Sequence, residues 1–157
     1  MRKADAWRIV EDDLSGAAIR ALLEVHFAGM LANSPAESCH FLDFDGLRAG
    51  DVTFWSIHCG VALAGCGALR MLDSTHGEIK SMRTAEPFLR QGVAARMLDH
   101  IVDTARERGL GRLSLETGSS GAFEPALALY RRYGFSECGP FADYTPDPFS
   151  RFMTRAL

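Results

Sequence analysis

The stretch LRQGVAARML, residues 89–98, joins a tight turn to the start of a helix, and the rest of the chain can be placed around it. Gly92 precedes apolar residues at helical spacing, and no Ser, Thr, Asp or Asn stands where a capping residue is expected. The first N–H groups of such a helix lack partners and lie at the positive end of its dipole. We therefore expect an anion to supply the cap.

The helix predicted over residues 92–109 is the most regular in the chain, and Gly109 ends it. Its apolar positions form two neighbouring rows: Val93, Met97 and Ile101, and Ala94, Leu98 and Val102. The segments 78–84 and 112–118 on either side of it have the composition of strands. A strand, helix and strand in this order predict two parallel strands joined by a right-handed crossover.

The remaining chain adds antiparallel pairing to this unit. We expect strands at 6–10, 52–60, 62–72 and 150–157, helices at 14–31 and 123–135, and a short helix near the end of the polar connection 32–50. No repeat or linker divides the chain, so its 157 residues predict one domain, 1–157. The α/β pattern predicts a mixed sheet with helices on both faces.

Charge and composition exclude several classes of function. A net charge of −3 gives no electrostatic basis for binding nucleic acid, and no apolar segment is long enough to span a membrane. The first residues carry no apolar core of a secretory signal, so we expect a cytoplasmic protein. The four cysteines are scattered without a Cys/His cluster, which predicts free thiols and no metal site.

The glycine turn indicates a cradle for phosphate. Gly92 allows the backbone to approach a ligand closely, and successive N–H groups would point at it. The turn is neither a GxxxxGK[ST] loop nor a GxGxxG loop. A purely structural turn is the alternative reading.

Two motifs resemble the GNAT superfamily of N-acetyltransferases. The run 89–94 is similar to that family's motif A, Q/R-x-x-G-x-G/A, with Gly92 and Ala94 at the last two fixed positions. Leu89 stands where Gln or Arg is usual, and Arg90 or Gln91 is the candidate to replace that contact. The segment ALALYRRYGF, 126–135, resembles the A-x-x-L-Y-x-x-x-G-F signature, and the similarity extends over about residues 50–140.

The resemblance implies a mixed, mostly antiparallel sheet of six to seven strands with one central parallel pair, and acetyl-CoA as co-substrate. The pyrophosphate would lie against the turn formed by Arg90, Gln91, Gly92, Val93, Ala94 and Ala95. The pantetheine arm would bond to the backbone of Met82, Arg83 and Thr84. Tyr130 would be the acid that assists the departing sulfur, since its hydroxyl is protonated at neutral pH. A core aromatic residue is the alternative for Tyr130.

The amine must be neutral to attack, so a carboxylate base is expected. Glu78 precedes Gly92 by 14 residues (92 − 78 = 14), the spacing of the catalytic glutamate in the histone-acetyltransferase branch. An ion pair with Lys80 is the alternative for Glu78. Glu116, on the next parallel strand, and His40 are rival bases.

The acceptor site is expected across the strand ends from acetyl-CoA. Its candidate residues come from the first connection, a strand and the last loop: Glu37, Ser38, His40, Trp55, Phe141 and Tyr144. Together they predict direct transfer of acetyl to a small-molecule primary amine in a ternary complex, with a homodimer possible. Two other hypotheses remain, a non-catalytic CoA-binding or regulatory module and a domain that binds another phosphate ligand.

Overall fold

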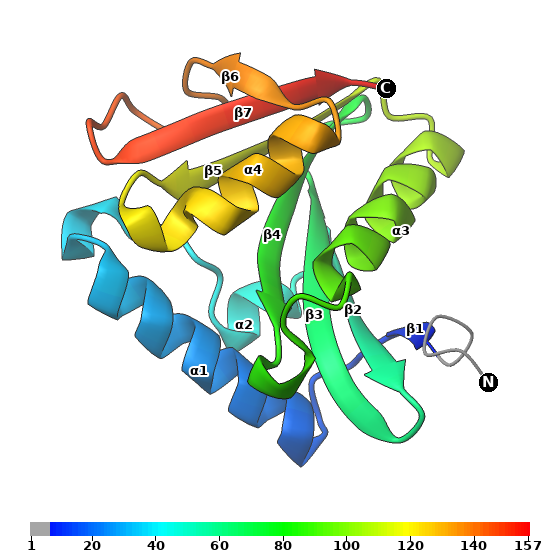
Figure 1. Ribbon diagram of the computed structural model, residues 1–157. Coiled ribbons are helices and arrows are strands. Elements are labelled where there is room, and N and C mark those ends of the chain that lie inside the picture. The colour runs from blue at the N-terminus through cyan, green and yellow to red at the C-terminus, as the bar shows by residue number, and fades with distance from the viewer. Residues whose placement is uncertain (1–6) are drawn as a thin grey trace.

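A computed structural model describes residues 7–157 and contains one twisted sheet of seven strands (Figure 1). The strand order is β1-β2-β3-β4-β5-β7-β6, and only β4 and β5 run parallel. The strands are β1 (Trp7–Glu11), β2 (Val52–Cys59), β3 (Ala62–Met71), β4 (His76–Thr84), β5 (Arg112–Gly118), β6 (Ser136–Cys138) and β7 (Ser150–Ala156). The predicted mixed, mostly antiparallel sheet with one central parallel pair is confirmed.

Four α-helices cover the sheet, and short 3-10 turns connect several elements. The helices are α1 (Ala17–Asn33), α2 (Phe44–Leu47), α3 (Val93–Glu107) and α4 (Glu124–Arg132). The 3-10 turns are η2 (Ala36–Ser38), η3 (Glu86–Phe88) and η4 (Gly121–Phe123). Figure 1 shows α3 and α4 lying along the sheet, with α3 over β3 and α4 beside β5.

Alternation along the strands divides the interior into two cores, because successive side chains of a strand point to opposite faces. Trp55 and Leu69 pack in the larger core, under α3 and α4. Their neighbours Phe54 and Ala68 pack in a smaller core with Leu23 of α1. The helices therefore cover both faces, as predicted.

Several boundaries differ from the predicted ones. β4 begins at His76, so Glu78 lies inside the strand instead of opening it. The helix predicted from residue 14 begins at Ala17, and Leu14 is buried just before it with a φ of +67°. Leu31, expected on the buried face of that helix, is exposed. β1 runs from Trp7 to Glu11, one residue past the predicted end, and residue 6 of the predicted strand lies outside the described residues.

A bulge in β4 reorients its side chains. Cys66 pairs with Arg83 and Ala68 with Lys80, so β4 contains one more residue than β3 between these two pairs. Ser81 in this segment has a φ of +56°. Because an extra residue reverses the alternation, Met82 packs into the core under α3, although Lys80, two residues earlier, faces the opposite side.

The parallel pair β4–β5 is short, and its strands then diverge. Three pairs join them, of which Glu78↔Ser114 is the last. Beyond it β4 continues beside β3, and β5 continues beside β7. The two strands are seen to separate in Figure 1. The divergence opens a gap in the middle of the sheet.

Candidate functional site

The start of α3 has the form that an anion site requires. Gly92 is the N-cap residue with a φ of +84°. No side chain caps this helix, and its first turn contains no acidic residue. A Cβ built on Gly92 would meet no atom within 4 Å, so the backbone there is open to a ligand. Arg90 shares the left-handed conformation, with a φ of +63°. These features fit a pyrophosphate held by the backbone N–H groups of the turn.

The gap between β4 and β5 holds a small cavity of 100 Å³, which is lined by the candidate acid and by one of the candidate bases. Tyr130 of α4 lines it from the larger core, and Glu116 of β5 lines it together with Lys80 of β4. No hydrogen bond of the Tyr130 hydroxyl occurs within residues 7–157, and burial raises the pKa of that hydroxyl. Burial also raises the pKa of the Glu116 carboxyl, as the low polarity of the site disfavours its charge.

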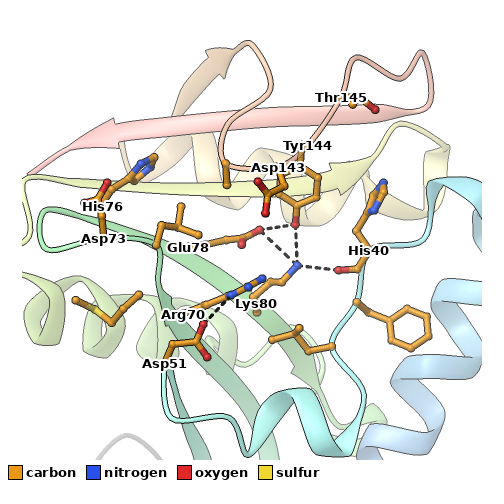
Figure 2. A pocket seen from close by; sticks show the side chains of 15 residues that line it. His40, Asp51, Arg70, Asp73, His76, Glu78, Lys80, Asp143, Tyr144 and Thr145 are labelled. Carbon is orange, nitrogen blue, oxygen red and sulfur yellow. Dashed lines mark hydrogen bonds and ion pairs between the residues drawn. The ribbon is translucent and has the colours of Figure 1, made fainter.

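Glu78 lies in a buried network instead of standing free. It is 1% exposed, and its Oε2 accepts a hydrogen bond of 2.6 Å from the Tyr144 hydroxyl. The Lys80 ammonium lies 3.4 Å from the same oxygen. The ion pair that the sequence left open as an alternative for Glu78 is therefore present, and Figure 2 shows it together with Tyr144.

A larger cavity of 590 Å³ lies over this network (Figure 2). The connection before α2 and the loop between β6 and β7 form its two sides, and β3 and β4 form its floor. His40 and Lys80 line this cavity and also the gap, so the two spaces adjoin. Arg70 on the floor pairs with Asp51 at 3.2 Å.

Aromatic rings extend from one loop to the other across this cavity. The His40 ring meets the Tyr144 ring edge-on at 5.2 Å, and Tyr144 meets Phe141 at 5.1 Å. Below them, the hydroxyl of the buried Ser38 donates a hydrogen bond of 2.5 Å to Asp147. Ring contacts and this hydrogen bond therefore join the two loops to each other.

The structure brings together some of the predicted acceptor residues and separates others. His40 and Tyr144 line the larger cavity, Phe141 lies in the same loop as Tyr144 and packs against its ring, and Ser38 bonds Asp147 of that loop. Trp55 is elsewhere, because it is 3% exposed in the core and packs edge-on against His100 of α3. β2 turns Trp55 toward α3, so it cannot form the aromatic wall that we expected. Glu37 is exposed on η2 outside the cavity.

The three residues at the end of β4 lie in three different surroundings. Met82 lines the gap from the α3 side, and Thr84 pairs with Gly65 of β3. Arg83 turns toward α1, where its Nη2 lies 3.4 Å from the carbonyl oxygens of Val25 and His26. No ion pair of Arg83 occurs within residues 7–157.

Lys80 lies at the centre of the network around Glu78, although we expected it only as a partner in an ion pair. One signal could have found it, since Lys80 is one of only two lysines in a chain whose lysines and arginines number 17. Strand alternation also places it on the same face as Glu78. Its contacts with the two loops could not have been read from the sequence.

Two further features of residues 7–157 bear on function. No group of three or more His, Cys, Asp or Glu side chains is arranged to hold a metal ion. No helix in this part of the chain is both long enough and apolar enough to cross a bilayer.

The family is established by comparison with known proteins. A model described as the acetyltransferase (GNAT) family matches residues 17–135, which is more than half of the chain. The chain therefore belongs to the GNAT family of acetyl-CoA-dependent N-acetyltransferases. A protein named "Uncharacterized N-acetyltransferase YsnE", from Bacillus subtilis (strain 168), is 53% identical over 146 residues, 93% of this chain and 97% of that protein.

A second relative has a more specific name. The "IAA acetyltransferase" of Azospirillum brasilense is 42% identical over 125 residues, 78% of this chain and 80% of its own length.

Solved structures show the same fold. A protein of Klebsiella pneumoniae subsp. pneumoniae MGH 78578, described as an acyl-CoA N-acyltransferase, has a TM-score of 0.76 and 27% identity, covering 96% of this chain and 97% of its own. A GNAT family acetyltransferase from Elizabethkingia anophelis, solved with acetyl-CoA bound, has a TM-score of 0.68 over 98% of this chain and 99% of its own. At 20% identity this second structure shows the fold alone.

Proposed function

We propose that the protein transfers an acetyl group from acetyl-CoA to a small-molecule primary amine by direct attack in a ternary complex. The observation that carries this proposal is the gap between β4 and β5, which Tyr130 and Glu116 both line and which adjoins the 590 Å³ cavity. One space can hold the thioester and the other the amine, so the two reactants can meet without a covalent enzyme intermediate.

Acetyl-CoA would be held along the turn at Gly92 and in the gap. The open, uncapped start of α3 suits its pyrophosphate, and the free edge of β4 beyond Glu78 suits its pantetheine arm. Bound there, it supplies an activated acyl thioester, so that transfer forms an N–C bond, breaks a C–S bond and releases a thiol.

Glu116 is the base that the geometry favours. It shares the gap with Tyr130, and burial raises the pKa of its carboxyl toward the pH at which an amine must lose a proton. Glu78 is the weaker candidate because its Oε2 already bonds Tyr144 and pairs with Lys80. Glu116 would take the amine proton directly or through one water.

Tyr130 is the hydrogen-bond donor to the sulfur. Its raised pKa keeps the hydroxyl protonated throughout the neutral range, which a donor needs. The same shift disfavours complete loss of the proton, so the hydroxyl assists the leaving sulfur chiefly by donating a hydrogen bond.

The acceptor is a small amine with an aromatic or apolar part. Tyr144 and His40 offer ring surfaces in the cavity, and carboxylates such as Asp73 and Asp143 line it. The relative named IAA acetyltransferase makes IAA a second acceptor to include.

The test is an acetylation screen that reads thiol release and confirms each acetylated product by mass spectrometry. Amines, amino acids, aminoglycosides, peptide N-termini and IAA form the panel. We expect turnover with at least one small amine and initial-rate lines that intersect, as a ternary complex requires. Parallel lines with an acetylated enzyme, or tight CoA binding without turnover on any acceptor, would contradict the proposal.

A further inference from the structure

Lys80 lies where the acceptor cavity meets the gap. It is 9% exposed, on β4, and it lines both spaces. Buried lysines are rare unless they are paired, and the proposed reaction does not itself use this side chain. Its position therefore needs its own explanation.

The Lys80 ammonium satisfies its three donors with groups from three different segments. It donates a hydrogen bond of 2.7 Å to the carbonyl oxygen of His40 and one of 2.8 Å to the Tyr144 hydroxyl (Figure 2). It also forms an ion pair of 3.4 Å with Glu78. His40 belongs to the connection before α2, and Tyr144 to the loop between β6 and β7. Lys80 thus joins both sides of the acceptor cavity to its floor.

The geometry favours an ammonium over a guanidinium. A lysine carries three donors on a compact head, which matches the three acceptors, whereas arginine presents five donors in a wide planar fork. Cationic residues in this chain are otherwise almost all arginine. A lysine at this position therefore provides one donor for each of the three acceptors.

The charge of Lys80 also acts on Glu116 across the gap. Burial is the largest influence on the Glu116 carboxyl and raises its pKa. The Ser150 hydroxyl and then the charges of His40 and Lys80 lower that pKa, whereas the charge of Glu78 raises it. The titratable groups that line the gap or act electrostatically on Glu116 come from five elements: His26, His40, Glu78, Lys80, Tyr130 and Tyr144. Of these six residues, only Lys80 is a lysine or an arginine.

We propose that Lys80 is a positioning residue for the transfer reaction, which ties both acceptor loops to β4 and supplies the positive charge beside Glu116. The inference rests on the proposed function, because Glu116 affects the rate only if it removes the proton of an amine. Lys80 itself takes no proton from the substrate. It acts through Glu116 and through the loops.

The first test is the pH profile of kcat/KM for the acceptor in Lys80→Met. Glu116 must be ionised to act, so activity rises with pH through its pKa. Losing the neighbouring cation moves this acid limb to higher pH, and we expect about tenfold more loss of activity at pH 6 than at pH 9. Arg106→Met removes an exposed cation from the last turn of α3 and is the matched control, with an acid limb like that of the wild type.

Lys80→Arg separates the two roles. The charge remains, so the acid limb should stay near that of the wild type. The wider head cannot reproduce the bonds to His40 and Tyr144, so the KM of the acceptor should rise about tenfold while the KM of acetyl-CoA changes little. An acid limb in Lys80→Met that coincides with the wild type overturns the electrostatic role, and an unchanged acceptor KM in Lys80→Arg overturns the tether.

A variant that removes both partners guards against misfolding. Lys80→Met leaves Glu78 as an unpaired buried charge, which is strongly destabilising. The double variant Lys80→Met/Glu78→Gln removes the pair together and should fold. Its acid limb should return toward that of the wild type, because opposite influences on Glu116 are lost, while its acceptor KM stays raised. An acceptor KM equal to that of the wild type overturns the tether here as well.

Two measurements without turnover distinguish failure of this inference from failure of the proposed function. Hydrogen exchange should be faster in residues 34–43 and 139–149 of the folded Lys80 variants than in the wild type. The carboxyl resonance of Glu116, labelled with ¹³C and assigned with Glu116→Gln, should titrate at higher pH in Lys80→Met. A wild type inert toward every acceptor contradicts the proposed function alone, whereas unchanged exchange and titration overturn the role of Lys80 in an active or an inactive enzyme.

Discussion

The start of α3 and the cavity over β4 are the two proposed binding regions of the molecule, and they are built in opposite ways. The first offers backbone N–H groups from one continuous segment, set by the left-handed conformation of Gly92. The second consists of side chains from β3, β4, the connection before α2 and the loop between β6 and β7. A backbone site tolerates many sequences around one glycine, whereas a side-chain site changes with every residue that lines it. The first region suits a co-substrate shared by a family, and the second suits an acceptor particular to one protein.

The largest effect is expected in the gap between β4 and β5, at Glu116. Glu116→Gln keeps the size of the side chain but cannot accept a proton, so kcat should fall by about 10² or more at neutral pH. Activity should return in part at high pH, where free amine is more abundant. Glu78→Gln is the matched comparison and should be milder, since a glutamine can still accept the hydrogen bond of Tyr144. Steady-state kinetics of both variants decide the matter, and the reverse order would assign the base to Glu78.

Tyr130→Phe should separate chemistry from binding in the same gap. We expect kcat to fall by about 10², while the affinity for acetyl-CoA changes little, because the hydroxyl acts mainly as the sulfur departs. Tyr133→Phe, at the residue that follows α4, is the control, since its hydroxyl contacts the Ala95 carbonyl oxygen and Asp99 and does not line the gap. Kinetics together with calorimetric binding test this, and weaker binding at unchanged kcat would make Tyr130 a packing residue.

Acid should weaken the fold through His26, which lines the gap from α1. Burial lowers the pKa of His26 from 6.5 to about 4. Between pH 6.5 and pH 4, His26 binds a proton in the unfolded chain but not in the native protein. The native state therefore has its full stability above pH 6.5 and loses this part of it as the pH falls toward 4. The loss amounts to about 3 kcal/mol. Urea unfolding of wild type and His26→Leu at pH 7 and pH 4 measures it, and equal pH dependence in both proteins would rule out this histidine as the cause.

The smallest effect concerns the backbone site. Acetyl-CoA at 100 times its Kd should stabilise the fold by about 2.7 kcal/mol, and Gly92→Val should abolish most of that gain. Gly109, at the other end of α3, also has a positive φ, +77°, and open space around it. Gly109→Val therefore carries similar backbone strain without touching the turn. Thermal shifts with and without acetyl-CoA should show that only Gly92→Val loses the response, and a response kept by Gly92→Val would place the pyrophosphate elsewhere.

Much of the fold could be predicted from local pattern. The helix at 93–107 and the strand at 112–118 follow from periodicity and flanking glycines, and both formed close to their predicted bounds. The bulge at Ser81 could not be predicted, because a left-handed serine in a strand has no sequence signature. It sends Met82 and Arg83 to opposite faces from those that simple alternation would give.

The candidate site divides along the same line. Tyr130 and Glu116 were named from motif and strand position, and the structure places both on one cavity. Trp55 was assigned to the wrong environment, because composition cannot say which face of β2 meets α3. The cage around Lys80 joins residues 40, 80 and 144, whose contact depends on how two distant loops fold back over the sheet.

The sequence by itself determined the elements whose structure depends on near neighbours: the uncapped helix start at Gly92, the apolar rows of α3 and the strands beside it. These depend on backbone conformation and on periodicity, which act over a few residues. Only the tertiary structure decided which carboxylate lines the gap and which forms an ion pair with Lys80. Glu78 and Glu116 are both acids on parallel strands, but the divergence of β4 and β5 leaves one in the gap, while Lys80 and Tyr144 close around the other. That difference arises from side chains brought together by folding, since burial and charge pairing depend on surroundings that residues far apart in the sequence supply.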